Sequence, residues 1–180
     1  MVTAAVVDEI RYPVGQFRID PDVTPQKRKM WIEQMADAPA KLRTALLGLS
    51  EEQLDTRYRK AGWTLRQVVH HLADAQLNGF TRFKLALTED RPAIKTYEED
   101  LWSETADGRE APVHLSVDLL TALHARWVIL LESLAESGFA RTFRHPQRGE
   151  LRIDDAVQLY AWHSIHHTAH VSQLRERKGW

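Results

Sequence analysis

The sequence predicts an all-α protein that is built as a four-helix bundle. Apolar residues recur every three to four positions in four long segments, which is the spacing of amphipathic helices. Capping residues and helix-stopping residues lie near the ends of these segments, and no repeat or domain linker interrupts the chain. With 180 residues there is enough chain for one domain with a sizeable core, so residues 1–180 are treated as a single domain.

Residues 1–23 are expected to form an extended arm, because two prolines, a glycine and several β-branched residues discourage a helix there. The first long helix is expected to follow Thr24 as its cap and to end near Leu49, with a bend or a restart at Pro39. The second helix is expected from Thr64 to about Glu89.

The second half of the chain starts with a long connection. Residues 91–115 are expected to be irregular, and a loop of this length is often functional or crosses from one end of a bundle to the other. The third helix is expected from Val117 to about Ser137, with Ser116 as its cap. Residues 139–152 form either a short hairpin or a plain loop.

The fourth helix, roughly Asp154 to Lys178, contains four histidines within eight residues, namely His163, His166, His167 and His170. Asp154 is expected to cap its start. Residues four positions apart share one face of a helix, so His163 and His167 form a row that His170 continues, and this row usually carries leucine in a core-facing helix. Buried polar groups need partners, and one divalent metal ion can pair with several imidazoles at once.

A second pair of histidines, His70 and His71, lies in the second helix. Adjacent helical residues point about 100° apart, so at most one of the two can face a given neighbour. Periodicity does not choose between them. The other three histidines, His114, His124 and His145, are isolated and are expected to be surface or lightly packed groups.

Composition narrows the possible functions. A net charge of -1 without a basic run gives no electrostatic case for nucleic acid or for a membrane surface. The absence of cysteine fits a reducing compartment, so the cytoplasm is the expected location; neither a signal peptide nor a membrane span is expected. The chain lacks the metalloprotease His-Glu-x-x-His motif, a phosphate-binding glycine loop and a serine nucleophile elbow. Three histidines with one open position are the known arrangement of a catalytic zinc site.

Several longer stretches resemble the DinB/YfiT-like superfamily, and within it the YfiT branch. These stretches are YPVG (12–15), GWTLRQVVHHLAD (62–74) with Asn78, RFKLALTE (82–89), YEEDLWSE (97–104), HARW (124–127) and YAWH (160–163). Together they cover almost the whole chain, from about Tyr12 to Trp180. The branch includes bacillithiol S-transferases and proteins named metal-dependent hydrolases.

The resemblance implies a DinB-like four-helix bundle, usually a homodimer, that holds one nickel or zinc ion on three histidines. The ligands that it implies, position by position, are His71, His163 and His167. Five further residues are candidates for the lining of the pocket or for contacts with the ligands: His70, Asp74, Asn78, His166 and His170. No general base is identified, so the catalytic residues stay unknown at this stage.

Three functions follow from these expectations. One is a metal-dependent transferase that uses a low-molecular-weight thiol as co-substrate against a small molecule. Another is a hydrolase that uses water at the same ion. In both, the ion would acidify the bound thiol or water near neutral pH. The third is a non-catalytic bundle that binds metal or only forms dimers.

Overall fold

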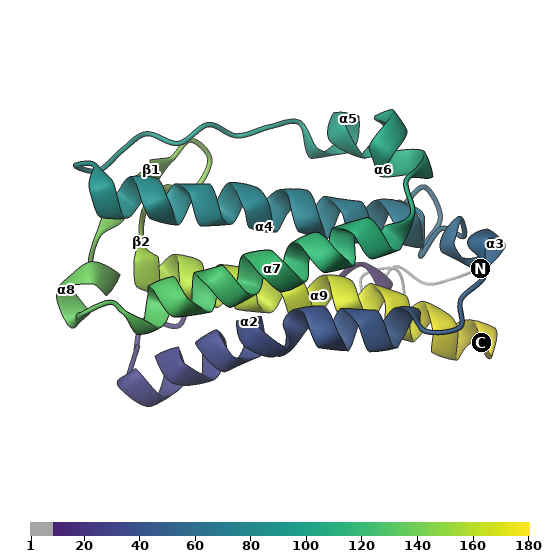
Figure 1. Cartoon of the computed structure of the whole chain (residues 1–180), viewed down its shortest axis with the longest axis horizontal. Helices are drawn as coiled ribbons and strands as arrows, with labels where there is room; N and C mark the ends of the chain where they lie inside the picture. Colours follow the sequence, from purple (N-terminus) through teal and green to yellow (C-terminus); the bar gives the residue numbers. More distant parts are fainter. Residues whose placement is uncertain (1–8) are drawn as a thin grey trace.

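A computed structural model describes residues 9–180, and four long helices packed side by side form its body (Figure 1). The elements in chain order are α2 (Pro25–Leu46), α3 (Glu51–Leu54), α4 (Leu65–Thr88), α5 (Glu99–Ser103), α6 (Ala106–Glu110), α7 (Val113–Glu132), α8 (Glu136–Phe139), β1 (Thr142–His145), β2 (Gly149–Arg152) and α9 (Ile153–Lys178). The predicted helical bundle is confirmed. The first part of the predicted arm, residues 1–8, lies outside the described residues; residues 9–11 are helical, and mostly irregular chain follows to Thr24.

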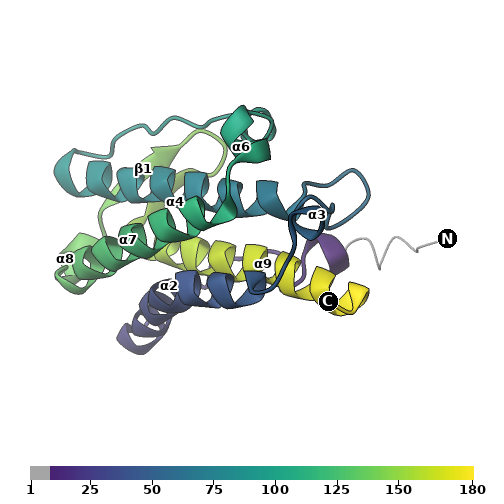
Figure 2. The ribbon, with the colours of Figure 1, turned by 45° about the vertical axis from the view of Figure 1, so that its right-hand side comes forward.

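The bundle consists of two pairs of helices. The two helices of a pair run parallel, and the two pairs run in opposite directions. α2 and α9 run in the same direction, since Arg28 pairs with Asp154 near both starts and Arg175 donates to the Ala45 carbonyl near both ends. α4 and α7 are also parallel, with His70 beside Ser116. A link between two parallel neighbours must travel back along the bundle, and the chain between α4 and α7 does so (Figures 1 and 2).

This returning connection differs from the prediction in two respects. It is not wholly irregular, because it contains the short helices α5 and α6. The next helix, α7, starts at Val113 after Pro112, and Ser116 is therefore inside the helix instead of at its cap. The Ser116 hydroxyl has another role, since it contacts Nδ1 of His70 at 2.7 Å.

α9 begins one residue earlier than predicted, and its cap is a different residue. Arg152 is the N-cap, and the Asp155 carboxylate accepts a hydrogen bond from the Arg152 backbone at 3.0 Å. Asp154 does not cap the helix. Its carboxylate forms a buried ion pair with the guanidinium of Arg28, at 2.7 Å, and so ties the starts of α2 and α9 together.

α2 continues through Pro39, so the restart, one of the two predicted alternatives, does not occur, and His124 explains how the helix continues. A proline has no N–H, so it leaves the carbonyl four residues before it without its helical partner. That carbonyl belongs to Met35, and it accepts a hydrogen bond from Nδ1 of His124 at 2.6 Å. His124 is therefore a fully buried residue and not a surface group, and His145 is buried as well.

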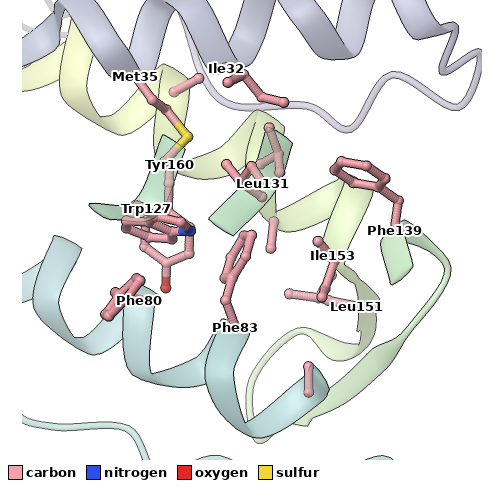
Figure 3. Packing of buried hydrophobic residues seen from close by; sticks show 14 of the residues in the cluster. Ile32, Met35, Phe80, Phe83, Trp127, Leu131, Phe139, Leu151, Ile153 and Tyr160 are labelled. Atoms are coloured by element: carbon pink, nitrogen blue, oxygen red, sulfur yellow. The ribbon is translucent and has the colours of Figure 1, made fainter. Parts of the chain in front are cut away.

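The end of the bundle away from the histidines is filled by a cluster of buried aromatic and aliphatic side chains (Figure 3). The ring of Trp127 packs edge-on against Phe83 with centroids 4.8 Å apart, and Tyr160 lies 5.2 Å from it. Gly79 allows α4 to approach this group, because a Cβ atom there would lie 2.5 Å from the Tyr160 ring. Because α4 and α9 approach each other closely at this end, the segments of the two helices that carry the histidines also lie close together.

Residues 142–152 form the hairpin that was one of the two predicted alternatives. β1 pairs antiparallel with β2, with Phe143 opposite Leu151 and His145 opposite Gly149. Gly149 has a φ of 75°, a conformation that glycine adopts without strain. The turn between the strands carries Gln147 and Arg148 to the side of the bundle on which the histidines lie.

α7 carries exposed apolar side chains on its outer face, beside charged residues such as Asp118 and Arg126. Its length and composition would also suit a membrane-spanning helix, so the expectation that no segment could span a membrane was too strong. Core helices of soluble proteins pass the same test, and the inner face of α7 packs on α2 and α4. The outer side chains Leu115, Leu119 and Ile129 are 54%, 44% and 67% exposed.

Candidate metal centre

Three histidine side chains converge between α4 and α9. His71 comes from α4, and His163 and His167 come from one face of α9, a single helical turn apart. One ring nitrogen from each lies within 4.8 Å of the others. The ring centroids of His71 are 5.4 Å from His163 and 4.9 Å from His167, and those of His163 and His167 are 4.4 Å apart.

Burial keeps these imidazoles uncharged. It lowers the pKa of His71 to about 4, with a smaller contribution from His166. The pKa values of His163 and His167 lie well below the usual histidine range, mainly because of burial and also because of the neighbouring imidazoles. A neutral imidazole has one nitrogen lone pair, which is the form that binds a metal ion.

The hydrogen bonds of His170 determine which nitrogen of His167 is free. Nε2 of His170 lies 3.2 Å from the Arg11 carbonyl, which only accepts, so this nitrogen carries the proton. Burial lowers the pKa of His170 to about 3, so the ring is neutral and its Nδ1 accepts from Nδ1 of His167 at 3.3 Å. The proton of His167 is therefore on Nδ1, and its Nε2 lone pair points at His163 and His71.

The donor set fits a divalent metal ion. Nε2 of His167 and Nε2 of His163 face each other at 3.1 Å, while Nδ1 of His163 is buried without a hydrogen-bond partner among residues 9–180. A neutral His163 has one proton for its two nitrogens, so in either tautomer its buried Nδ1 stays without a partner, which is costly unless another group pairs with the ring. Three imidazoles without thiolate or carboxylate suit zinc or nickel, and leave positions open for another ligand.

His70, the rival of His71 in the sequence, lies outside this cluster. Its Nε2 donates to the Ala111 carbonyl at 2.9 Å, and its Nδ1 accepts from the Ser116 hydroxyl at 2.7 Å. Both ring nitrogens are therefore used in joining α4 to the start of α7. The structure answers the question that periodicity left open, since only His71 faces the histidines of α9.

Two polar candidates from the sequence, Asp74 and Asn78, are not in the walls of the two cavities that reach the cluster. The Asn78 amide donates to the Asp74 backbone carbonyl at 2.9 Å within α4. Asp74 is half-buried, and burial raises its pKa to about 6, with a smaller contribution from Asp107. Neither residue is in a position to contact a small molecule at the cluster through these cavities.

Two cavities meet at this cluster: both include His71 and His163 in their walls, and the second also includes His167. The first has a volume of about 230 Å³ and extends along α4 to Arg82, Tyr97 and Tyr160. The second has a volume of about 470 Å³ and extends toward the N-terminal segment. Its wall contains Arg11, Tyr12, Tyr58, Trp63, Trp162, His166 and His170.

Three residues that line both cavities were not singled out from the sequence: Glu99, Asp100 and Arg148. Asp100 accepts a hydrogen bond from the indole nitrogen of Trp63 at 3.1 Å, and the Trp63 ring packs on His71 with centroids 4.4 Å apart. The acidic run 98–100 in the long connection was a visible signal for this wall. Arg148 had none, because its place depends on the hairpin turn.

Comparison with known proteins identifies the family. Residues 34–171 match the sequence profile of the DinB superfamily. The chain belongs to the DinB superfamily. A relative from Bacillus cereus strain 03BB102, named "Putative metal-dependent hydrolase", is 47% identical over 174 residues, which are 97% of this chain and 100% of the relative. A relative of the same kind from Bacillus mycoides strain KBAB4 is 47% identical over 96% of this chain and 99% of its own length.

The fold is that of a solved structure of the same superfamily. YfiT from Bacillus subtilis, described as "a probable metal-dependent hydrolase with an unusual four-helix bundle topology", superimposes with a TM-score of 0.93. It is 43% identical in sequence, and the match covers 96% of this chain and 99% of YfiT. The resemblance to the DinB superfamily and its YfiT branch, expected from the motifs, is thereby confirmed.

Proposed function

We propose that this protein is a metal-dependent enzyme that transfers a low-molecular-weight thiol to an electrophilic small molecule, with His71, His163 and His167 as the metal ligands. The observation that supports this proposal is the position of three neutral imidazoles at the meeting point of two cavities. Two reactants can approach such a centre from different sides, as a transfer reaction requires. A zinc or nickel ion held there would lower the pKa of a thiol that binds to it.

Residues of the cavity walls would handle the proton and the substrate. Desolvation, together with the negative charge of Asp100, raises the pKa of Glu99, and its carboxylate is the group that we assign to accept the thiol proton. Arg148 has no carboxylate partner among the residues that the structure describes. It lines both cavities together with His71 and His163, so its charge is available to hold an anionic substrate group beside the ion.

Hydrolysis is the second candidate. Relatives that cover nearly the whole chain bear the name of metal-dependent hydrolases, and the same three ligands would serve water in place of a thiol. In that reaction Glu99 would accept a proton from water.

The chain has no cysteine of its own, so we place it in the cytoplasm, where free thiols are supplied by the cell.

The test is metal analysis of the purified protein, followed by assays on the same sample. We expect about one zinc or nickel ion per chain and conjugation of a thiol, such as bacillithiol or cysteine, to a haloaromatic electrophile, in which the new carbon–sulfur bond replaces the carbon–halogen bond and halide is released. His163→Ala should lose both the ion and the activity, while His114→Ala, which alters an exposed histidine, should lose neither. Turnover of esters or amides without thiol would favour hydrolysis. If the wild type holds no ion and His163→Ala does not differ from it, the protein is a non-catalytic bundle and the proposal is contradicted.

We also propose that the protein forms a homodimer through the outer face of α7. Leu115, Leu119 and Ile129 are exposed on one side of α7, with Arg126 between the last two, and would be covered by a second copy. Sedimentation velocity should show a dimer that Leu119→Glu with Ile129→Lys converts to monomer. Leu47→Glu, an equally exposed leucine at the end of α2, is the control and should leave the dimer intact. A monomeric wild type at micromolar concentration would disprove this assembly.

A further inference from the structure

A second group of histidine nitrogens lies next to the first and shares His167 with it. One ring nitrogen each from His166, His167 and His170 lies within 4.8 Å of the others, and all three residues are buried. Their ring centroids are 4.8 Å apart for His166 and His167 and 4.4 Å apart for His166 and His170. All three rings line the larger cavity, so this group is reachable from the same side as the proposed catalytic ion.

The orientation of His170 is that of a metal ligand. Histidines that bind metals usually donate their other N–H to a carbonyl or a carboxylate, which fixes the ring and directs the free lone pair at the ion. In His170, Nε2 donates to the Arg11 carbonyl at 3.2 Å, and the Nδ1 lone pair faces the other two rings. The N-terminal segment therefore orients this imidazole.

His166 supplies the second, independent observation. The residue is buried, with 7% of its surface exposed, and its Nδ1 has no hydrogen-bond partner among residues 9–180. The ring is fixed by stacking on Trp162, with centroids 4.5 Å apart. A rigid, buried nitrogen without a partner is costly, and a cation between His166 and His170 would pair with it.

We infer that His166, His170 and Nδ1 of His167 form a second site for a divalent cation that prefers nitrogen ligands, such as zinc or nickel. The imidazole of His167 is common to both sites, with Nε2 toward the inner ion and Nδ1 toward the outer one. With both sites filled, its Nδ1 proton has to leave and two cations lie on one ring. The outer ion therefore binds more weakly while the inner site is occupied than when it is empty.

The experiment titrates zinc into metal-free protein and measures stoichiometry and affinity by calorimetry and by competition with a chromophoric chelator. His71→Ala with His163→Ala removes two inner ligands and leaves the outer group intact. This double variant should still bind about one zinc ion, and adding His166→Ala should weaken that binding at least about tenfold. Adding His114→Ala instead, the matched control at an exposed histidine, should change nothing.

A double variant that binds zinc no better than the triple variant would overturn the inference. If the double variant does not fold, the wild type loaded with one zinc ion takes its place. A second, weaker equivalent should then appear in the wild type and be missing in His166→Ala, and its presence in both would equally overturn the inference. The first zinc equivalent reports on the inner site and the second on the outer site. Failure of the proposed function, which depends on the inner site, is therefore distinguished from failure of this inference.

Discussion

At the scale of single residues, two histidines that are adjacent in the sequence have different roles. His70 and His71 are adjacent in α4, yet one joins α4 to the connection and to α7, while the other faces the histidines of α9. Hydrogen bonds saturate both nitrogens of His70. The His71 ring has no hydrogen bond among residues 9–180 and packs on the rings of Trp63, His163 and His167.

This difference predicts opposite effects for two alanine substitutions. His70→Ala leaves the Ala111 carbonyl and the Ser116 hydroxyl without their partner and should lower the free energy of unfolding by about 1–3 kcal/mol, with the metal content unchanged. His71→Ala should weaken zinc binding by about two orders of magnitude or more and should leave the stability of the metal-free protein nearly unchanged. Urea unfolding and chelator competition measure the two quantities. Equal loss of metal in both variants would contradict the assignment of His71.

At the scale of the helices, local signals predicted more than long-range ones. Thr24 caps α2 as expected, and α4 starts directly after its cap Thr64, within one residue of the predicted start, because capping depends on the few residues that follow. The start of α7 was misplaced because Ser116, a good capping residue, is taken by His70, which is 46 positions away. Periodicity alone likewise could not choose His71 over His70, since the choice depends on which helix each faces.

His124 gives the element-scale prediction. His124→Leu should destabilise the protein by about 1–3 kcal/mol, because the Met35 carbonyl then stays buried without a partner. Pro39→Ala restores a backbone N–H that can reach this carbonyl. In the Pro39→Ala background the cost of His124→Leu should therefore fall by about 1 kcal/mol. Urea unfolding of the four proteins forms a double-mutant cycle, and strictly additive effects would show that the two residues are not coupled.

At the scale of the whole molecule, the bundle contains an unusual number of buried neutral histidines. Burial lowers the pKa values of His70, His71, His124, His145, His163, His166, His167 and His170. In the unfolded chain these groups titrate near pH 6.5, whereas in the folded chain they stay neutral to lower pH. At pH values between the folded-state and the unfolded-state pKa values, the unfolded chain therefore binds more protons than the folded chain.

The metal-free protein should therefore lose stability steeply as the pH falls below about 6.5. Stability rises with pH wherever the unfolded state binds more protons, by up to about 1.4 kcal/mol per pH unit for each such histidine. Urea unfolding at pH 7.5, 6.5, 5.5 and 4.5 in the presence of a chelator measures the slope. Saturating zinc should raise stability at pH 7.5, since it binds only the folded chain, and the gain should shrink on acidification. A flat profile between pH 7.5 and 5.5 would contradict this account.

The return path from α4 to α7 has a consequence for how such proteins can diversify. Because these helices are parallel neighbours, the intervening chain must traverse the length of the bundle, and on its way Thr96, Tyr97, Glu98, Glu99 and Asp100 become one wall of a cavity. The histidines belong to other segments, α4 and α9. Mutation of this stretch can therefore reshape what the protein accepts while the ion-holding scaffold is inherited unchanged.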